Sequence, residues 1–129
     1  MILSNAYNYI NVLNKAADAG WQRNTVLSNN IANVDTPGYK RQDVEFEAYL
    51  YEAVNGNDSL DDAINHLDLD TLHTTTYTDK SNLSYRIDGN NVDVHTENVE
   101  LAKNQLKYYT LMDSMNQEFS RLKAALKTS

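Results

Sequence analysis

The sequence predicts a mainly α-helical protein, in which two long helices at the ends of the chain pair as a coiled coil, with a loop-rich middle and a short β-hairpin. Apolar residues recur at alternating three- and four-residue steps over residues 3–34 and 101–126, the spacing of a helix with one apolar stripe. A turn-rich stretch separates them. We therefore divide the chain into an N-terminal helix (1–34), a middle segment (35–94) and a C-terminal helix (95–129), which together form one domain.

The N-terminal helix is expected to pack through a stripe with few large side chains. The stripe consists of Leu3, Ala6, Ile10, Leu13, Ala17, Gly20, Asn24, Leu27, Ile31 and Val34. Its small and polar members allow a close approach but bury little area, so a helix of this kind is marginal alone and needs a partner. Tyr7, Tyr9 and Trp21 lie off the stripe and give the helix a second face for packing.

A sharp turn is expected after this helix, which should end near Asn33. Asparagine side chains compete for local backbone groups and favour a helix end. Pro37, the only proline of the chain, disfavours the helical conformation at Thr36. Pro37 and Gly38 suit the centre of a type II turn with Gly38 at positive φ, after which Tyr39 returns to an apolar surface.

The middle segment is strongly acidic and offers only short elements. Ten acids and no Lys or Arg lie between Arg41 and Lys80, a net charge of −10, whereas the remaining eight acids and eleven bases give +3. Such an acidic excess argues against nucleic acid as a partner. Lys40 and Arg41 should remain in solvent or meet an anionic group. Ser59 can cap a short helix that runs to Leu67.

Two further elements complete the chain. Alternation over residues 83–87 and 92–94, around Asp88-Gly89-Asn90-Asn91, predicts the β-hairpin. The C-terminal helix should begin near His95, with Thr96 as its cap and Glu97 in its first turn. Its apolar stripe consists of Leu101, Gln105, Tyr108, Met112, Met115, Phe119, Leu122 and Leu126.

No residue pattern predicts catalysis. The chain has no cysteine, and His66, His73 and His95 are scattered without the spacing of a metal site. No acidic run has the glycine and final glutamate of a calcium loop, and no phosphate-binding glycine loop is present. We therefore expect no enzyme activity, no metal and no cofactor.

Two blocks of residues carry a resemblance to a known family. Asn29-Asn30-Ile31-Ala32-Asn33, followed after two residues by Thr36-Pro37-Gly38-Tyr39-Lys40, resembles the N-terminal signature of bacterial flagellar rod and hook proteins. The block over residues 88–94, with the helix that follows it, is similar to the proximal rod FlgB family. The acidic insert at about 58–79 has no counterpart in this resemblance.

The resemblance implies a structural subunit of the proximal rod of the bacterial flagellar basal body. Such a subunit polymerises helically through its terminal helices into a drive shaft that transmits torque and is required for motility. Implied partners are copies of itself, other rod proteins, and membrane ring and export gate components at the rod base, with no nucleic acid or small-molecule substrate. The resemblance also implies export through the flagellar type III apparatus without a cleaved signal peptide.

The expected assembly residues come from both terminal stripes and from the turn. They are Leu3, Ile10, Leu13, Leu27, Asn30, Ile31, Asn33, Thr36, Pro37, Gly38, Tyr39, Leu101, Tyr108, Met112, Met115, Phe119 and Leu122. Two alternatives stay open at this point. The chain can be another rod component, or a soluble helical adaptor or export chaperone that binds an amphipathic partner helix.

Overall fold

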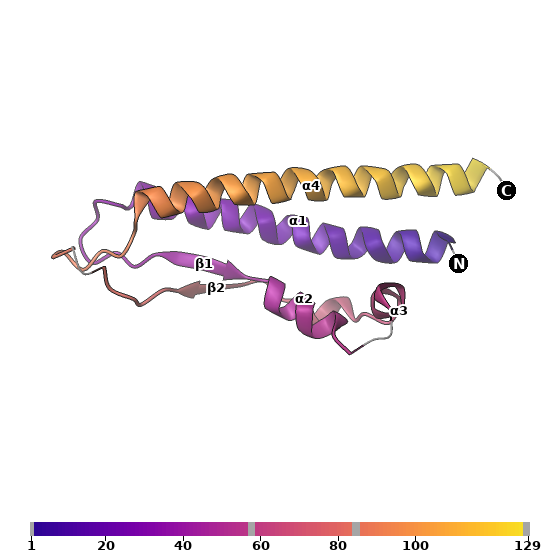
Figure 1. Cartoon of the computed structure of the whole chain (residues 1–129), viewed down its shortest axis with the longest axis horizontal. Coiled ribbons are helices and arrows are strands. Elements are labelled where there is room, and N and C mark those ends of the chain that lie inside the picture. Colours follow the sequence, from indigo (N-terminus) through magenta and orange to yellow (C-terminus); the bar gives the residue numbers. More distant parts are fainter. Residues whose placement is uncertain (1, 57–58, 84–85, 128–129) are drawn as a thin grey trace.

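A computed structural model of the chain describes residues 2–56, 59–83 and 86–127, with side chains from residue 6 onward (Figure 1). The elements follow in the order α1 (Ile2–Ala32), β1 (Gln42–Glu45), α2 (Glu47–Val54), α3 (Leu60–Asn65), the 3-10 turn η1 (Leu69–Thr71), β2 (Thr75–Thr78) and α4 (Val94–Lys127). Within these described residues, no helix is both long enough and apolar enough to cross a membrane.

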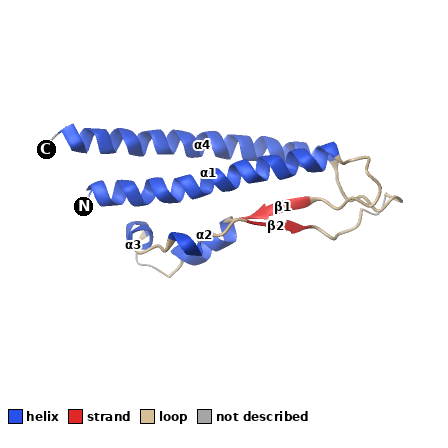
Figure 2. Cartoon of the chain, turned by 180° about the vertical axis from the view of Figure 1, so that it is seen from behind, coloured by secondary structure: helices blue, strands red, loops and turns tan. Residues whose placement is uncertain are grey.

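The long terminal helices α1 and α4 pack against each other in opposite directions, so both ends of the chain lie at the same end of the molecule (Figure 1). This pairing confirms the predicted fold class. The middle segment returns along the pair, with β1 and α3 packed against α1 (Figure 2). It contributes the core cluster of Phe46 and Leu72, which close over Ala19 of α1.

The predicted two-stranded sheet exists, but other residues form it. β1 and β2 are antiparallel, with Gln42 opposite Thr78 and Glu45 opposite Thr75. The hairpin predicted over residues 83–94 is wrong in its position, because residues 86–93 form a loop and Val94 already begins α4. Residues 84 and 85 lie outside the described residues. The loop is favoured here because the side chain of Asn90 takes the place of a partner strand. It donates to the carbonyl of Val34 and accepts from the backbone N–H of Val92.

Local signals predict most helix ends correctly. α1 ends at Ala32, one residue before Asn33, and Ser59 caps α3 by accepting a hydrogen bond from the backbone of Asp62 at 3.1 Å. The cap predicted for α4 is wrong. Asp93, not Thr96, accepts from the backbone of His95 at 3.0 Å, because a short carboxylate satisfies the first backbone donors and favours the helix dipole.

The face that α4 turns toward α1 differs in part from its predicted stripe. Leu101, Tyr108, Met115 and Leu122 are buried or half-buried as expected. The other four predicted positions, Gln105, Met112, Phe119 and Leu126, are exposed. In each case the residue one position earlier is less exposed, so the face toward α1 contains Asn104, Leu111, Glu118 and Ala125 instead. One cause is a long-range contact, since Asn104 donates its side-chain amide to the carbonyl of Gly20 in α1 at 2.9 Å.

Candidate assembly surfaces

The turn after α1 has the predicted geometry. The backbone of Tyr39 donates to the carbonyl of Thr36 at 3.2 Å, and Gly38 has a φ of 75°. The two residues between them, Pro37 and Gly38, are therefore the central residues of the turn. Gly38 also donates its backbone N–H to the carbonyl of Asp88 at 2.8 Å, so the turn is held by the loop that precedes α4.

The two sequence blocks that resemble the rod family meet in space at this turn. Asn90 is 1% exposed, and its side-chain amide donates at 2.9 to 3.0 Å to the carbonyls of Asn33, Val34 and Thr36. Asn91 accepts from the backbone of Arg41 at 2.6 Å. The loop before α4 is thus hydrogen-bonded to the backbone of the turn that follows α1.

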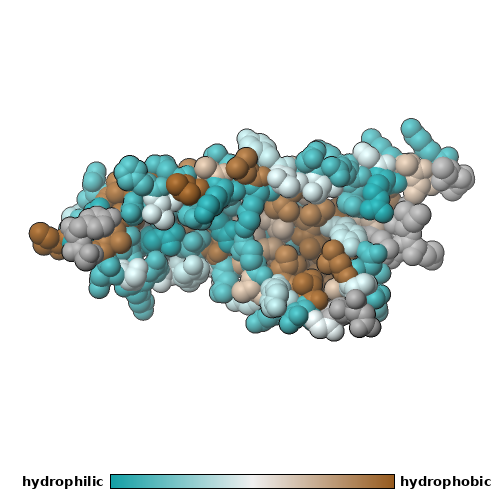
Figure 3. Space-filling model, viewed as in Figure 1, coloured by the Kyte–Doolittle hydropathy of each residue, from teal (hydrophilic) through white to brown (hydrophobic). Residues whose placement is uncertain are grey.

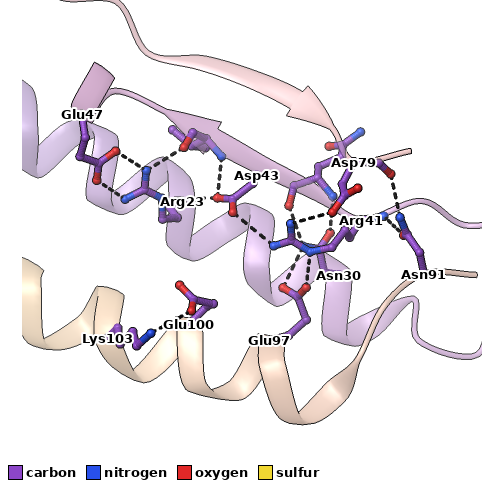
Figure 4. Close-up of polar contacts among 12 residues, drawn as sticks. Arg23, Asn30, Arg41, Asp43, Glu47, Asp79, Asn91, Glu97, Glu100 and Lys103 are labelled. Carbon is purple, nitrogen blue, oxygen red and sulfur yellow. Dashed lines mark hydrogen bonds and ion pairs between the residues drawn. The ribbon is translucent and has the colours of Figure 1, made fainter. Parts of the chain in front are cut away.

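A buried carboxylate joins the turn to both long helices (Figure 4). Glu97 of α4 has no exposed surface and accepts from Arg41 at 2.5 Å and from the Asn30 amide at 3.0 Å. Asn30, also fully buried, accepts from the backbone of Gln42 at 2.9 Å and from the hydroxyl of Tyr39 at 3.2 Å. Arg41 therefore meets an anionic group, one of the two outcomes expected from the sequence.

Further ion pairs continue along β1 (Figure 4). Asp43 pairs with Arg41 at 3.2 Å and with Arg23 of α1 at 3.4 Å. Burial tends to lower the pKa of Arg41, but the hydrogen bond and charge of Glu97 outweigh it and raise the pKa. The hydrogen bond from Arg23 lowers the pKa of Glu47 to about 2. These charges fix β1 and the start of α2 against α1.

One side of the α1–α4 pair, which we call the open face, carries large apolar side chains in solvent. Trp21 is 64% exposed and Tyr109 70%, and both line a small pocket of about 160 Å³ that contains no residue of the middle segment. Residues seven, fourteen or twenty-one apart lie on roughly the same side of a helix. The open face therefore also includes four exposed residues in register with Trp21 or with the pocket residue Gln105: Tyr7, Met112, Phe119 and Leu126.

A second apolar surface, the α2–α4 groove, lies on the side that the middle segment partly covers. It has a volume of about 570 Å³. Its apolar lining comes from α1, α2, α4 and the residue that precedes α2, and includes Ala16, Ala19, Phe46, Leu50, Leu106 and Leu111. Figure 3 shows apolar side chains gathered in the middle of this view, between α4 and the α2 region.

The predicted assembly residues occupy different depths in the single chain. Buried are Leu27, Asn30 and Leu122; half-buried are Ile10, Leu13, Ile31, Asn33, Tyr39, Leu101, Tyr108 and Met115; exposed are Thr36, Pro37, Gly38, Met112 and Phe119. Leu3 lies in α1, and its side chain is outside the described part of the chain. The buried members support the fold, and the others have surface available for a neighbouring subunit.

Sequence reasoning misses the residues that organise the turn. It treats Glu97 only as a favourable first-turn acid, and Asn90 only as part of a hairpin connection. A signal for Asn90 is present in the Asp-Gly-Asn-Asn run, since asparagine side chains readily hydrogen-bond backbone groups. No sequence signal marks Glu97 as buried.

Comparison with known proteins agrees with this architecture. Residues 10–40, which contain most of α1 and the turn, match the family described as flagella basal body rod protein. The chain is 39% identical to flagellar basal body rod protein FlgB of Bacillus subtilis (strain 168), with 78% of this chain and 79% of that protein aligned. It is 38% identical to FlgB of Aeromonas hydrophila, with 82% of this chain and 83% of that protein aligned. It is 32% identical to FlgB of Escherichia coli (strain K12), with 74% of this chain and 75% of that protein aligned.

The paired terminal helices and the matched turn are thus those of a flagellar basal body rod protein. Because these relatives align over most of the sequence at 32 to 39% identity, the chain belongs to the FlgB family.

Proposed function

We propose that this chain is a structural subunit of the proximal rod of the bacterial flagellar basal body. Copies stack helically to form part of the drive shaft that transmits torque, so the chain is required for motility. Membership of the FlgB family supports this role. The observation that carries the assembly mechanism is the open face, where two long helices leave a row of large apolar side chains in water.

The open face acts as the main contact between subunits. Tyr109 and Phe119 are 70% and 45% exposed, and large apolar side chains gathered in solvent on one side of a protein favour contact with another molecule. Burial of one large apolar side chain stabilises a contact by about 1.5 to 3 kcal/mol. In a helical polymer this gain recurs in every subunit, so a modest contact suffices to hold the rod together.

The turn supplies a second contact at the end of the molecule. Thr36, Pro37 and Gly38 are exposed, while the buried network around Asn30 and Glu97 holds their backbone in place. A rigid, exposed turn can contact a neighbour with little loss of conformational entropy. Tyr39 has one side in this network and the other available to a neighbouring subunit.

The partners of this subunit are copies of itself and other rod proteins, with membrane ring and export gate components at the rod base. It reaches the rod through the flagellar type III export apparatus without a cleaved signal peptide. Its role is structural rather than enzymatic, and it needs no cofactor, small-molecule substrate or nucleic acid. The three segments 1–34, 35–94 and 95–129 act as one rod-type domain.

The test is complementation of a strain that lacks this gene. Wild-type chain should restore swimming and complete rods. Phe119→Ser should leave the helical content of the purified protein unchanged but abolish both. Gln117→Ser, at an exposed position on the opposite side of α4, is the matched control and should behave as wild type.

Two results would count against the proposal. Normal rods in cells without the chain would refute the rod function itself. Normal rods and swimming with Phe119→Ser would refute the open face as the contact between subunits.

A further inference from the structure

The chain contains a residue pair whose chemistry the rod function does not use. Asn55 is the only asparagine of the sequence that a glycine follows, Gly56. The backbone nitrogen of the following residue can attack the side-chain carbonyl carbon of an asparagine, and such an attack is favoured because both groups belong to one chain and are held close together. Glycine has no Cβ to obstruct the approach, and its backbone is less restricted than that of any other residue. Asn55 is therefore the asparagine that the sequence makes most reactive.

The structure leaves this pair without restraint. Both residues lie in the turn after α2, and both are exposed. The backbone N–H of Asn55 donates to the carbonyl of Tyr51 at 2.9 Å and closes the last turn of α2. In the part of the chain that the structure describes, neither the Asn55 side chain nor the backbone N–H of Gly56 has a hydrogen-bond partner. A Cβ added to Gly56 would have no packed atom within 4 Å, so the surroundings do not hinder rotation of this backbone.

A second pair that can close the same kind of ring is held by the fold. Asp88 is the only aspartate that a glycine follows, Gly89. Arg86 donates to both of its carboxylate oxygens, at 3.1 and 2.9 Å, and the backbone N–H of Asn90 donates to one of them at 3.1 Å. These bonds lower the pKa of Asp88 and keep the group a carboxylate, which is a poor target for a nucleophile. The carbonyl of Asp88 also accepts from the backbone of Gly38 at 2.8 Å, which restrains rotation. The structure therefore distinguishes Asn55 from Asp88.

We propose that Asn55 is a site of spontaneous deamidation. The Gly56 nitrogen gives up its proton to the solvent and bonds to Cγ of Asn55, while the bond from Cγ to Nδ2 breaks and that nitrogen takes up a proton and leaves as ammonia. The product is a cyclic succinimide. One water molecule then opens the ring, at the side-chain carbonyl to give aspartate or at the backbone carbonyl to give isoaspartate. Water is the only co-reactant, and nothing is oxidised or reduced.

Deamidation changes the charge at the end of α2. Either product adds one negative charge, so the net charge of the chain changes from −7 to −8. The new charge lies at the C-terminal end of the helix, where the helix dipole disfavours an anion. Leu50 and Ala53 of α2 pack against the core cluster. The reaction therefore weakens the last turn of a helix that covers the core.

Ageing of the purified full-length chain tests the site. The folded chain and the chain unfolded in guanidinium chloride are incubated in mildly alkaline buffer, and peptide mapping by tandem mass spectrometry with isoaspartyl methyl labelling follows each residue. Residue 55 should gain the mass of an exchange of NH for O, at a rate within about threefold of its rate in the unfolded chain. Isoaspartate at residue 88 should form at least about tenfold more slowly in the folded chain than in the unfolded chain.

Asn82 is the matched control within the same chain, because it is exposed in a loop but is followed by Leu83. It should stay unmodified over the same period. Equal conversion at Asn82 and Asn55 would overturn the inference. So would a folded chain in which Asn55 reacts more slowly than the expected range, because the fold would then protect this pair as well.

Two variants separate the reaction from its effect on α2. Asn55→Gln has one more methylene group and must close a larger ring, so it should stay unmodified while its helical circular dichroism signal matches the wild type. Asn55→Asp carries the new charge from the start, and the protection of the residue 55 amide, which bonds to Tyr51, should fall roughly two- to fivefold in hydrogen exchange. An equal mass change in Asn55→Gln would overturn the site, and unchanged protection in Asn55→Asp would overturn the effect on α2. All these measurements use the purified chain, so their failure would leave the rod function standing.

Discussion

Replacing Glu97 by Gln perturbs the buried carboxylate that joins α1, the turn and α4. Each carboxylate oxygen of Glu97 accepts one hydrogen bond, from Arg41 and from Asn30. Gln has nearly the same shape but only one acceptor oxygen, and its NH₂ group is a donor. In either orientation, one of the two native donors therefore faces another donor in a site with no exposed surface.

The size of the effect follows from what Arg41 retains. Removal of one partner from a buried ion pair costs about 3 to 5 kcal/mol when the other charge is left alone. Arg41 keeps Asp43 at 3.2 Å and Asp79 at 3.5 Å, and its side chain is 15% exposed. We therefore expect a loss of about 2 to 3 kcal/mol in the free energy of unfolding. For a domain of this size, that loss lowers Tm by roughly 6 to 15 °C.

The assay is denaturant and thermal unfolding of the purified monomer, followed by the helical circular dichroism signal. Glu100→Gln is the matched control on the same helix. Its ion pair with Lys103 is exposed, at 41% and 66%, and should contribute less than about 1 kcal/mol. Equal losses in the two variants would show that the buried network around Glu97 does not determine how the turn docks on the helices.

Three further outcomes are expected. Gly38→Val should cost about 1 to 3 kcal/mol through its φ of 75° alone, since a Cβ at this position would have no atom within 4 Å; Gly38→Asn should cost less, and equal costs would contradict a backbone cause. Asn104→Leu should change monomer stability by no more than about 1 kcal/mol, because the acceptor without a partner is lost together with the donor; a loss above about 3 kcal/mol would contradict this. Because Arg23 lowers the pKa of Glu47 from 4.5 to about 2, the stability from this pair is present above about pH 4.5 and is lost as the pH falls toward 2; Glu47→Gln should remove that part of the acid dependence of unfolding.

Features that depend on neighbours in the sequence were predictable. The stripe of α1 and the length of α4 follow from a three- and four-residue period, which a helix imposes whatever it later contacts. The turn follows from Pro37 and Gly38, whose φ preferences are intrinsic to those residue types. The cap of α3 by Ser59 is equally local. The first block of the family resemblance, residues 29–40, spans this same turn.

The rest was decided by tertiary structure, because it depends on residues far apart in the chain. β1 and β2 have four residues each and are separated by 29 residues, so neither carries a periodic signal of its own. The rotation of α4 depends on Asn104 reaching Gly20, 84 positions away. Glu97 is an ordinary first-turn acid in the sequence, and it becomes the buried centre of the turn only when Asn30 and Arg41 are brought to it. A charged side chain can be buried only where groups of opposite charge or hydrogen-bond donors lie within reach, and the fold sets the positions of those groups.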